Sequence, residues 1–119
     1  MKNLNSGDLI IQLEERGGKK FMSWLGKSRE KNPGTELNPY FEEVITDFGN
    51  DELIVNFYKL EYMNSSTVPS IIKLFKLLEK SNISTIVQYN NESGWQRASF
   101  KALSTIAENL KNVTVEGIA

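Results

Sequence analysis

The 119 residues carry 14 basic and 15 acidic side chains, a near-neutral balance in a chain long enough to bury one hydrophobic core. Histidine and cysteine are both absent, which excludes disulfides, thiolate chemistry and every Ser-His or Cys-His nucleophile, and leaves no basis for a metal site. The chain shows no basic stripe, no membrane-length apolar run and no secretory signal. We therefore expect one cytoplasmic domain over residues 1–119, with no cofactor, no nucleic-acid partner and no membrane partner.

The first predicted unit is a β-hairpin. Residues 9–13 and 21–25 are apolar, and the polar connection between them contains Gly17 and Gly18. Two adjacent glycines can adopt the positive φ values of a tight hairpin turn. Although Gly17-Gly18-Lys19-Lys20 resembles part of a phosphate loop, it lacks the spacing and the following helix of one. The hairpin is the better interpretation.

A short helix should follow after a polar loop. Asn38 is a favourable N-cap, and Pro39 suits the first helical position. The apolar residues of this segment then recur with helical spacing and precede Gly49. They are Phe41, Val44, Ile45 and Phe48. We expect these four side chains to face the core.

The remainder alternates between strands and helices. Residues 52–58 begin the predicted central strand, residues 83–89 form a further strand, and residues 112–118 form the last one. The helix after the central strand should have one buried face, flanked by Leu74 and Leu77, that consists of Val68, Ile71, Ile72, Phe75 and Leu78. The last helix, from residue 95 to 110, should bury Ala98, Ala102, Leu103, Ile106, Ala107 and Leu110. The resulting order is ββαβαβαβ, an α/β fold with an N-terminal hairpin and helices packed on a mixed, partly parallel sheet.

Four polar residues stand at one strand-to-helix junction: Asn64, Ser65, Ser66 and Thr67. Sites are commonly built where parallel strands run into helices. One interpretation is capping, because these side chains can accept hydrogen bonds from the first N–H groups of a helix. The other is a phosphoacceptor or anion site, since a helix N-terminus favours negative charge. A cap needs only one such residue, and the two interpretations remain open at this stage.

The segment "LEYMNSSTV", followed by the helix "PSIIKLFKLLEK" and preceded by a hairpin, resembles the STAS domain of bacterial anti-sigma-factor antagonists. In that family the serine at this helix start is phosphorylated by a kinase that is itself the anti-sigma factor. The resemblance implies that Ser65 is the phosphoacceptor, with Ser66 and Thr67 as alternatives. Asn64 stands where the family usually has aspartate, and Thr67 where it often has glycine.

A related group fits the asparagine better. Small bacterial phosphoproteins with a Tyr-x-Asn-Ser/Thr run control a diguanylate cyclase, and residues 62–66 resemble that run. Either resemblance implies a signal-transduction protein in a partner-switching pathway, whose partners are a serine/threonine kinase and a cognate phosphatase, or a cyclase. We expect partner-binding residues in and near the junction: Gly26, Ser28, Tyr62, Met63, Asn64, Ser66, Thr67 and Trp95.

The competing hypothesis is a small enzyme. It would need an isolated carboxylate pair or a serine activated by lysine, and no such motif is present. The neighbouring carboxylates Glu42 and Glu43 point in different directions on a helix. We therefore expect no catalytic residues, and we expect a monomer in the free state because no additional apolar surface is evident.

Overall fold

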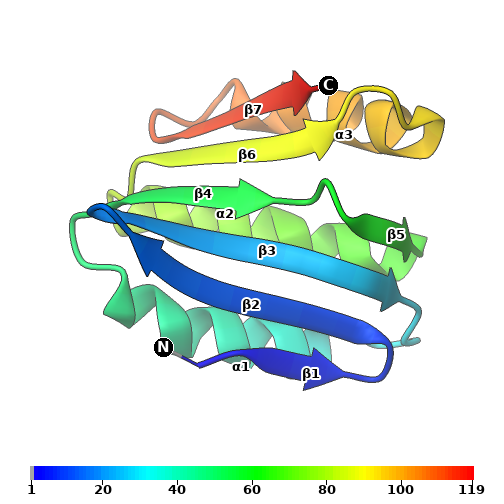
Figure 1. The fold of residues 1–119 in the computed structure, drawn as a ribbon, viewed down its shortest axis with the longest axis horizontal. Coiled ribbons are helices and arrows are strands. Elements are labelled where there is room, and N and C mark those ends of the chain that lie inside the picture. Colours follow the sequence, from blue (N-terminus) through cyan, green and yellow to red (C-terminus); the bar gives the residue numbers. More distant parts are fainter. Residues whose placement is uncertain (1) are drawn as a thin grey trace.

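A seven-stranded mixed sheet with three α-helices makes up the computed structural model, which describes residues 2–119 (Figure 1). The sheet order is β1-β2-β3-β4-β6-β7, with β5 beside β3. The strands are β1 (Leu4–Ser6), β2 (Leu9–Arg16), β3 (Lys19–Ser28), β4 (Glu52–Asn56), β5 (Leu60–Met63), β6 (Thr85–Asn90) and β7 (Val113–Ile118). The helices are α1 (Gly34–Val44), α2 (Val68–Lys80) and α3 (Gly94–Ala107), with 3-10 turns at Ile45–Asp47 and Ser65–Thr67.

The strand pairing confirms the predicted mixed sheet. Strands β1, β2 and β3 are antiparallel to one another, while β3, β4, β6 and β7 run parallel. Gly17 and Gly18 both have positive φ, at 57° and 79°, so the two glycines form the hairpin turn between β2 and β3 as predicted. Strand β1 was not predicted. Its three residues are too few to show an alternating pattern.

Helix α1 begins earlier than predicted. It starts at Gly34, after Pro33, so Asn38 and Pro39 lie inside the helix and not at its start. The proline costs a helix interior about 3 kcal/mol, because it lacks an N–H and crowds the preceding turn. The longer helix buries Leu37, which is worth about 1.5–3 kcal/mol and offsets much of that cost.

The apolar face of α1 is correctly predicted. Phe41 and Val44 are buried on the helix itself, and Ile45 and Phe48 are buried in the turn that follows. Gly49 then adopts a φ of 60°, a left-handed conformation that ends the segment.

The predicted central strand is split in two. Strand β4 ends at Asn56, the chain bends at residues 57–59, and β5 then pairs with the end of β3 (Figure 1). The bend is held by the Leu60 N–H, which donates to the Phe57 carbonyl oxygen, and by the Tyr58 N–H, which donates to the Asn56 side chain. Local hydrogen bonds of this kind are not visible in an apolar pattern.

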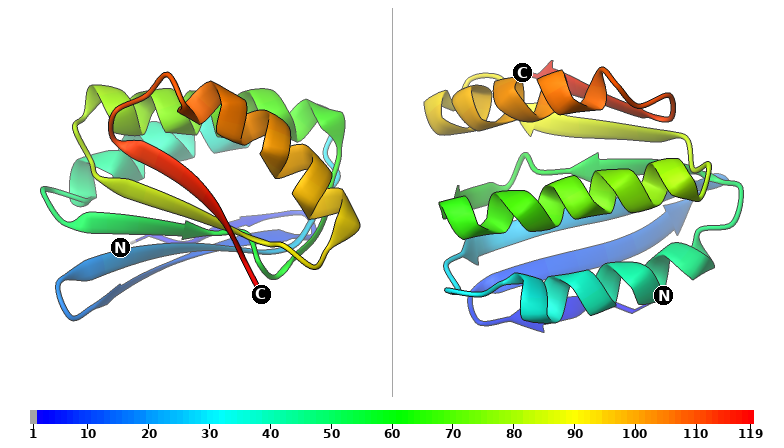
Figure 2. Two further views of the ribbon diagram at one scale, coloured as in Figure 1. Left: turned by 90° about the horizontal axis from the view of Figure 1, so that it is seen from above. Right: turned by 180° about the vertical axis from the view of Figure 1, so that it is seen from behind.

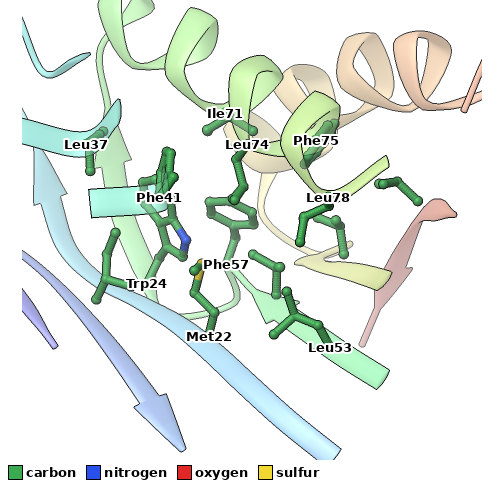
Figure 3. Close-up of a cluster of buried hydrophobic side chains, with 14 of the residues drawn as sticks. Met22, Trp24, Leu37, Phe41, Leu53, Phe57, Ile71, Leu74, Phe75 and Leu78 are labelled. Atoms are coloured by element: carbon green, nitrogen blue, oxygen red, sulfur yellow. The ribbon is translucent and has the colours of Figure 1, made fainter. Parts of the chain in front are cut away.

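The core lies between the sheet and the helices and is rich in aromatic rings (Figure 3). The ring centroids of Trp24 on β3 and Phe57 lie 4.8 Å apart, and those of Phe57 and Phe100 on α3 are also 4.8 Å apart. Tyr89 on β6 stacks on Phe100 at 5.4 Å. This chain of rings joins β3, the bend after β4, α3 and β6 into one packed layer.

The faces of the last two helices differ in part from the prediction. On α2, Ile71, Leu74, Phe75 and Leu78 are buried, whereas Ile72 is half-buried at the flank. Leu74 therefore takes the central place that had been given to Ile72.

On α3 the buried residues are Gln96, Phe100, Leu103 and Ala107, while Ala98 and Ala102 are exposed. Phe100 sets this rotation, because its ring is the largest apolar group of the helix that can fill the space beside Tyr89. The alanines are too small to compete for that space.

All three helices cover the same face of the sheet, and the opposite face carries none (Figure 2). The junction between β5 and α2 lies at the carboxyl ends of the parallel strands (Figure 1). No helix in residues 2–119 is long and apolar enough to cross a membrane.

Candidate functional site

The junction between β5 and α2 contains a 3-10 turn, Ser65–Thr67, that leads directly into the helix. Asn64 precedes the turn in an extended conformation, with φ −83° and ψ 169°. Its N–H donates to the Ser28 carbonyl oxygen, which continues the pairing of β5 with β3. The position of the turn is therefore set by the end of β3.

A network of side chains lies beneath the turn. The Thr67 hydroxyl donates to Asn64 Oδ1 at 2.8 Å and lies 2.7 Å from the Ser28 hydroxyl. A hydroxyl has one proton, so Ser28 must donate the bond that it shares with Thr67. Asn64 Nδ2 donates to the Glu30 carbonyl oxygen at 2.9 Å. The network thus uses the amide of Asn64 as both donor and acceptor.

This geometry explains why position 64 carries asparagine. An aspartate would keep the acceptor for Thr67 but would turn its second oxygen toward the carbonyl oxygen of Glu30. Two acceptors without a proton between them repel, and neither is then satisfied. The asparagine is therefore matched to the loop that follows β3.

The capping interpretation is wrong for this helix start. Neither the 3-10 turn nor α2 has a side-chain cap hydrogen bond, although both N-cap residues, Asn64 and Thr67, carry suitable oxygens. Their side chains bond to each other and to the end of β3 instead. The Thr67 and Val68 N–H groups donate to the carbonyl oxygens of Asn64 and Ser65, so backbone bonds close the turn, and the positive end of the helix dipole favours negative charge nearby.

The three hydroxyls of the run differ in exposure. Thr67 is 0% exposed, and its hydroxyl is occupied in the network. Ser65 and Ser66 are both exposed, and within residues 2–119 neither side chain forms a hydrogen bond. A modifying enzyme could therefore reach Ser65 or Ser66 in this conformation, but not Thr67.

Ser66 borders a hollow of about 520 Å³ between the starts of α1 and α2. Lys31 and the residues from Asn32 to Thr35 line its other side. Ser65 does not line this hollow. A phosphate on Ser66 would thus face Lys31 and the N-terminus of α1, whereas one on Ser65 would project from the surface.

The other residues expected to bind a partner fall into two groups. Ser28 and Met63 are register partners across β3 and β5, and both are buried, so they support the junction from below. Tyr62 is 47% exposed and points away from the core. It is available to a partner, while Ser28, Met63 and Thr67 can act only through the residues above them.

Gly26 and Trp95 lie further from the exposed serines along the chain. Gly26 has a φ of 82°, and a Cβ there would lie 2.1 Å from the Asp8 carbonyl oxygen, so the position requires glycine for structural reasons. Trp95 is half-buried against the core at the start of α3. Their role in partner binding stays a prediction.

Sequence reasoning missed Gln96, which is 1% exposed. Its Nε2 donates to the carbonyl oxygens of Phe57 and Leu60, and its Oε1 accepts from the N–H of Asn90. These bonds hold the bend that leads into β5. The signal was available, because Gln96 is polar yet shares helical spacing with the buried residues Phe100 and Leu103.

Two groups with displaced pKa values lie outside the junction. The hydrogen bond to Asp51 raises the pKa of Lys20, at the start of β3, despite the opposing effect of burial. Burial, with a smaller contribution from Glu43, raises the pKa of Tyr40 on α1.

Residues 2–119 contain no cluster of three or more histidine, cysteine, aspartate or glutamate side chains that could hold a metal ion. The junction is built from neutral hydroxyls and amides.

Comparison with known proteins supports the architecture. No protein-family model matches the sequence, and no curated protein matches it. Solved structures do match. One is a chain of the Pseudomonas aeruginosa complex of the diguanylate cyclase SiaD with its activator SiaC, with a TM-score of 0.67, 17% identity, and coverage of 99% of this chain and 100% of that chain.

Two further solved structures also match the chain. An anti-sigma factor antagonist from Mycobacterium paratuberculosis matches with a TM-score of 0.63 and 15% identity, over 93% of this chain and 90% of that chain. A Shewanella loihica protein with a SpoIIAA-like fold matches with a TM-score of 0.59 and 10% identity, over 99% of this chain and 91% of that chain. The chain has a STAS-like fold. At these identities the comparisons establish the STAS-like architecture, and they confirm the fold predicted from the sequence.

Proposed function

We propose that this STAS-like protein is a phosphorylation-controlled regulatory binding protein of a bacterial partner-switching pathway in the cytoplasm. In the proposal, the unmodified form binds a kinase of the anti-sigma-factor type or a related regulator, and phosphorylation at the junction releases the partner. One observation carries it: two exposed, unbonded serines stand at a helix start whose N–H groups lack a side-chain cap. The similar solved structures, a cyclase with its activator and an anti-sigma factor antagonist, support it because both contain regulatory proteins.

The phosphoacceptor that we propose is Ser65. It is the position that matches the acceptor of the antagonist family, and it is exposed on the surface of the turn. A phosphoryl group would add about −1.5 to −2 charge and three acceptor oxygens where the surface is now neutral. The helix N-terminus tolerates that charge, but a partner docked over the serine would have to bury it unpaired, which is costly. The switch therefore acts on binding and not on folding.

A second candidate function is the activation of a diguanylate cyclase. Two observations favour it: the matched structure of a cyclase with its activator, and the asparagine at position 64, which the network with Glu30 and Thr67 requires. In this branch the same serine would control binding to the cyclase in place of a sigma-factor regulator. A cognate phosphatase restores the binding form in both branches.

Phosphosite mapping by mass spectrometry tests the proposal. The full chain is incubated with ATP and with each candidate kinase, or with ATP alone, and binding to unmodified and modified protein is measured by calorimetry. Phosphate on Ser65 with loss of binding is expected, and Ser65→Ala should remain unmodified and still bind. The protein alone should turn over neither ATP nor generic phosphoesters. Modification of Ser66 with Ser65 unmodified would overturn the acceptor assignment, and modification of neither would overturn the switch.

A further inference from the structure

One face of the sheet carries no helix among residues 2–119 (Figure 2). Beside the junction, this helix-free face has exposed apolar and basic side chains. Along the end of β3, Trp24 and Ser28 point into the core, so Leu25 and Lys27 point to the helix-free face. Tyr62 on β5 is the register partner of Lys27 and lies on the same face. This face therefore reaches the residues next to Ser65.

A hollow of about 350 Å³ opens at this end of the face. Four residues line it: Lys27, Arg29, Tyr62 and Asn64. It thus combines two cations and one aromatic ring, and none of the lining residues is acidic. Asn64 connects the hollow with the junction network, because the same side chain binds Thr67.

Both charged residues that line the hollow are basic. Lys27 is exposed and forms no ion pair within residues 2–119. Arg29 pairs with Asp8, but both side chains are more than half exposed, so water screens that pair and a competing carboxylate can share the guanidinium. The carboxylate of Glu30 is turned toward Gly7. Lys27 is therefore available to pair with an acidic group that enters the hollow.

Apolar surface continues from the hollow along the sheet. Ile10 and Tyr62 are the large hydrophobic side chains with the greatest exposure in the described chain, at 37% and 47%. Both lie on the helix-free face, since Ile10 is the register partner of Leu25 across β2 and β3. Exposed apolar side chains beside a charged hollow are typical of a protein-binding surface.

We infer that this surface docks an acidic amphipathic segment of a protein partner. A carboxylate of the segment binds between Lys27 and Arg29, and an adjacent apolar side chain packs on Tyr62 and toward Leu25. The inference rests on the proposed function in that it specifies the chemistry of the partner. A nucleic acid fits less well, because the chain has a net charge of −1.

The test is an NMR titration of the full isotope-labelled chain with two peptides. The probe is acetyl-Asp-Leu-Phe-Asp amide, and its matched control is acetyl-Asn-Leu-Phe-Asn amide. The acidic peptide should shift the amide resonances of Lys27, Arg29 and Tyr62, and the control should bind about fivefold more weakly or worse. No shifts, shifts centred on the helices, or equal affinity of the two peptides would overturn the inference. Tighter binding of oligothymidylate through the same resonances would also overturn it, in favour of a nucleic acid.

Two charge-reversed variants sharpen the result. Lys27→Glu should weaken the acidic peptide about fivefold or more. Lys76→Glu changes the net charge equally but lies exposed on α2, and it should leave the affinity unchanged. Equal weakening by both variants would show a non-specific charge effect and reject the hollow. Thermal unfolding followed by circular dichroism verifies that both variants are folded.

These measurements are independent of phosphorylation. If the peptide binds at the hollow but no kinase modifies Ser65 or Ser66, the proposed switch is removed and the docking surface stays in place. Phosphorylation of Ser65 without peptide binding would reject the docking surface and leave the proposed switch in place.

Discussion

The hydroxyl oxygens of Ser28 and Thr67 lie 2.7 Å apart beneath the junction and join the end of β3 to the start of α2. The Thr67 hydroxyl donates its hydrogen bond to Asn64 Oδ1, so Ser28 must be the donor in the bond between Ser28 and Thr67. The exposed serines above this network are therefore held by residues that are themselves shielded from solvent.

Thr67→Val keeps the volume of the side chain but removes the hydroxyl. Ser28 would lose its acceptor and Asn64 its donor, and unsatisfied groups in this buried layer cost about 1–3 kcal/mol. Denaturant unfolding measures the loss. The control is Ser66→Ala, which removes an exposed hydroxyl and should change stability by less than about 0.5 kcal/mol. Equal effects of the two variants would contradict the network.

Asn64→Asp tests the match between the junction and the loop after β3. The substitution replaces the donor to the Glu30 carbonyl with a second acceptor, so it should lower the free energy of unfolding by about 0.5–1.5 kcal/mol at neutral pH, because this bond is exposed to water. Asn64→Ser, which has a shorter side chain with a donor, serves as the comparison. If the Asn64→Asp variant is as stable as the wild type, the Asn64 amide does not donate to the Glu30 carbonyl as described.

Gln96→Leu should destabilise the bend between β4 and β5. It removes the side-chain donor to the carbonyl oxygens of Phe57 and Leu60 and the side-chain acceptor of the Asn90 N–H, for a loss of about 2–4 kcal/mol, although the Leu60 N–H still donates to Phe57. Amide exchange should rise in residues 57–66 more than in the hairpin. Arg97→Ala, whose side chain makes one exposed bond to the Asn91 carbonyl, should have little effect. A uniform rise in exchange would argue against a local role.

Alanine substitutions at Leu74 and Ile72, the two residues compared for the central buried position on α2, should lower the free energy of unfolding by different amounts. Leu74 is fully buried, so Leu74→Ala should lose about 2–5 kcal/mol through the cavity it leaves. Ile72 is half-buried, so Ile72→Ala should cost clearly less. Urea unfolding of both variants decides between them, and a larger loss for Ile72 would restore the face predicted from the sequence.

Lys20 should contribute stability that is lost at alkaline pH. Its Nζ donates to the Phe48 carbonyl oxygen and to Asp51, and the bond to Asp51 raises its pKa above the ordinary value of 10.5. A raised pKa in the folded state favours folding below the unfolded pKa, and this contribution disappears as pH rises through the folded pKa. Lys20→Met should therefore be less stable at neutral pH, and the difference from the wild type should shrink above about pH 10.5. A constant difference across that range would contradict the assignment.

Local patterns were enough to predict much of the fold. The paired glycines at Gly17 and Gly18, the apolar spacing from Phe41 to Phe48 and the strand at residues 113–118 depend on neighbours within a few positions. Turn conformations and single apolar faces are local properties of this kind. The order of these elements then restricted the topology to a mixed sheet. The position of the polar run at a strand-to-helix junction followed from the same order.

Tertiary structure decided the rest. Helix α1 starts at Gly34 because the core can bury Leu37, and α3 turns Phe100 inward because Phe57 and Tyr89 leave room for its ring. The difference between exposed Ser65 and buried Thr67 depends on Ser28, which lies 39 positions away from Thr67 in the chain. Sequence determined that hydroxyls stand at the junction, and long-range packing determined which of them reach solvent, because burial depends on contacts between distant segments.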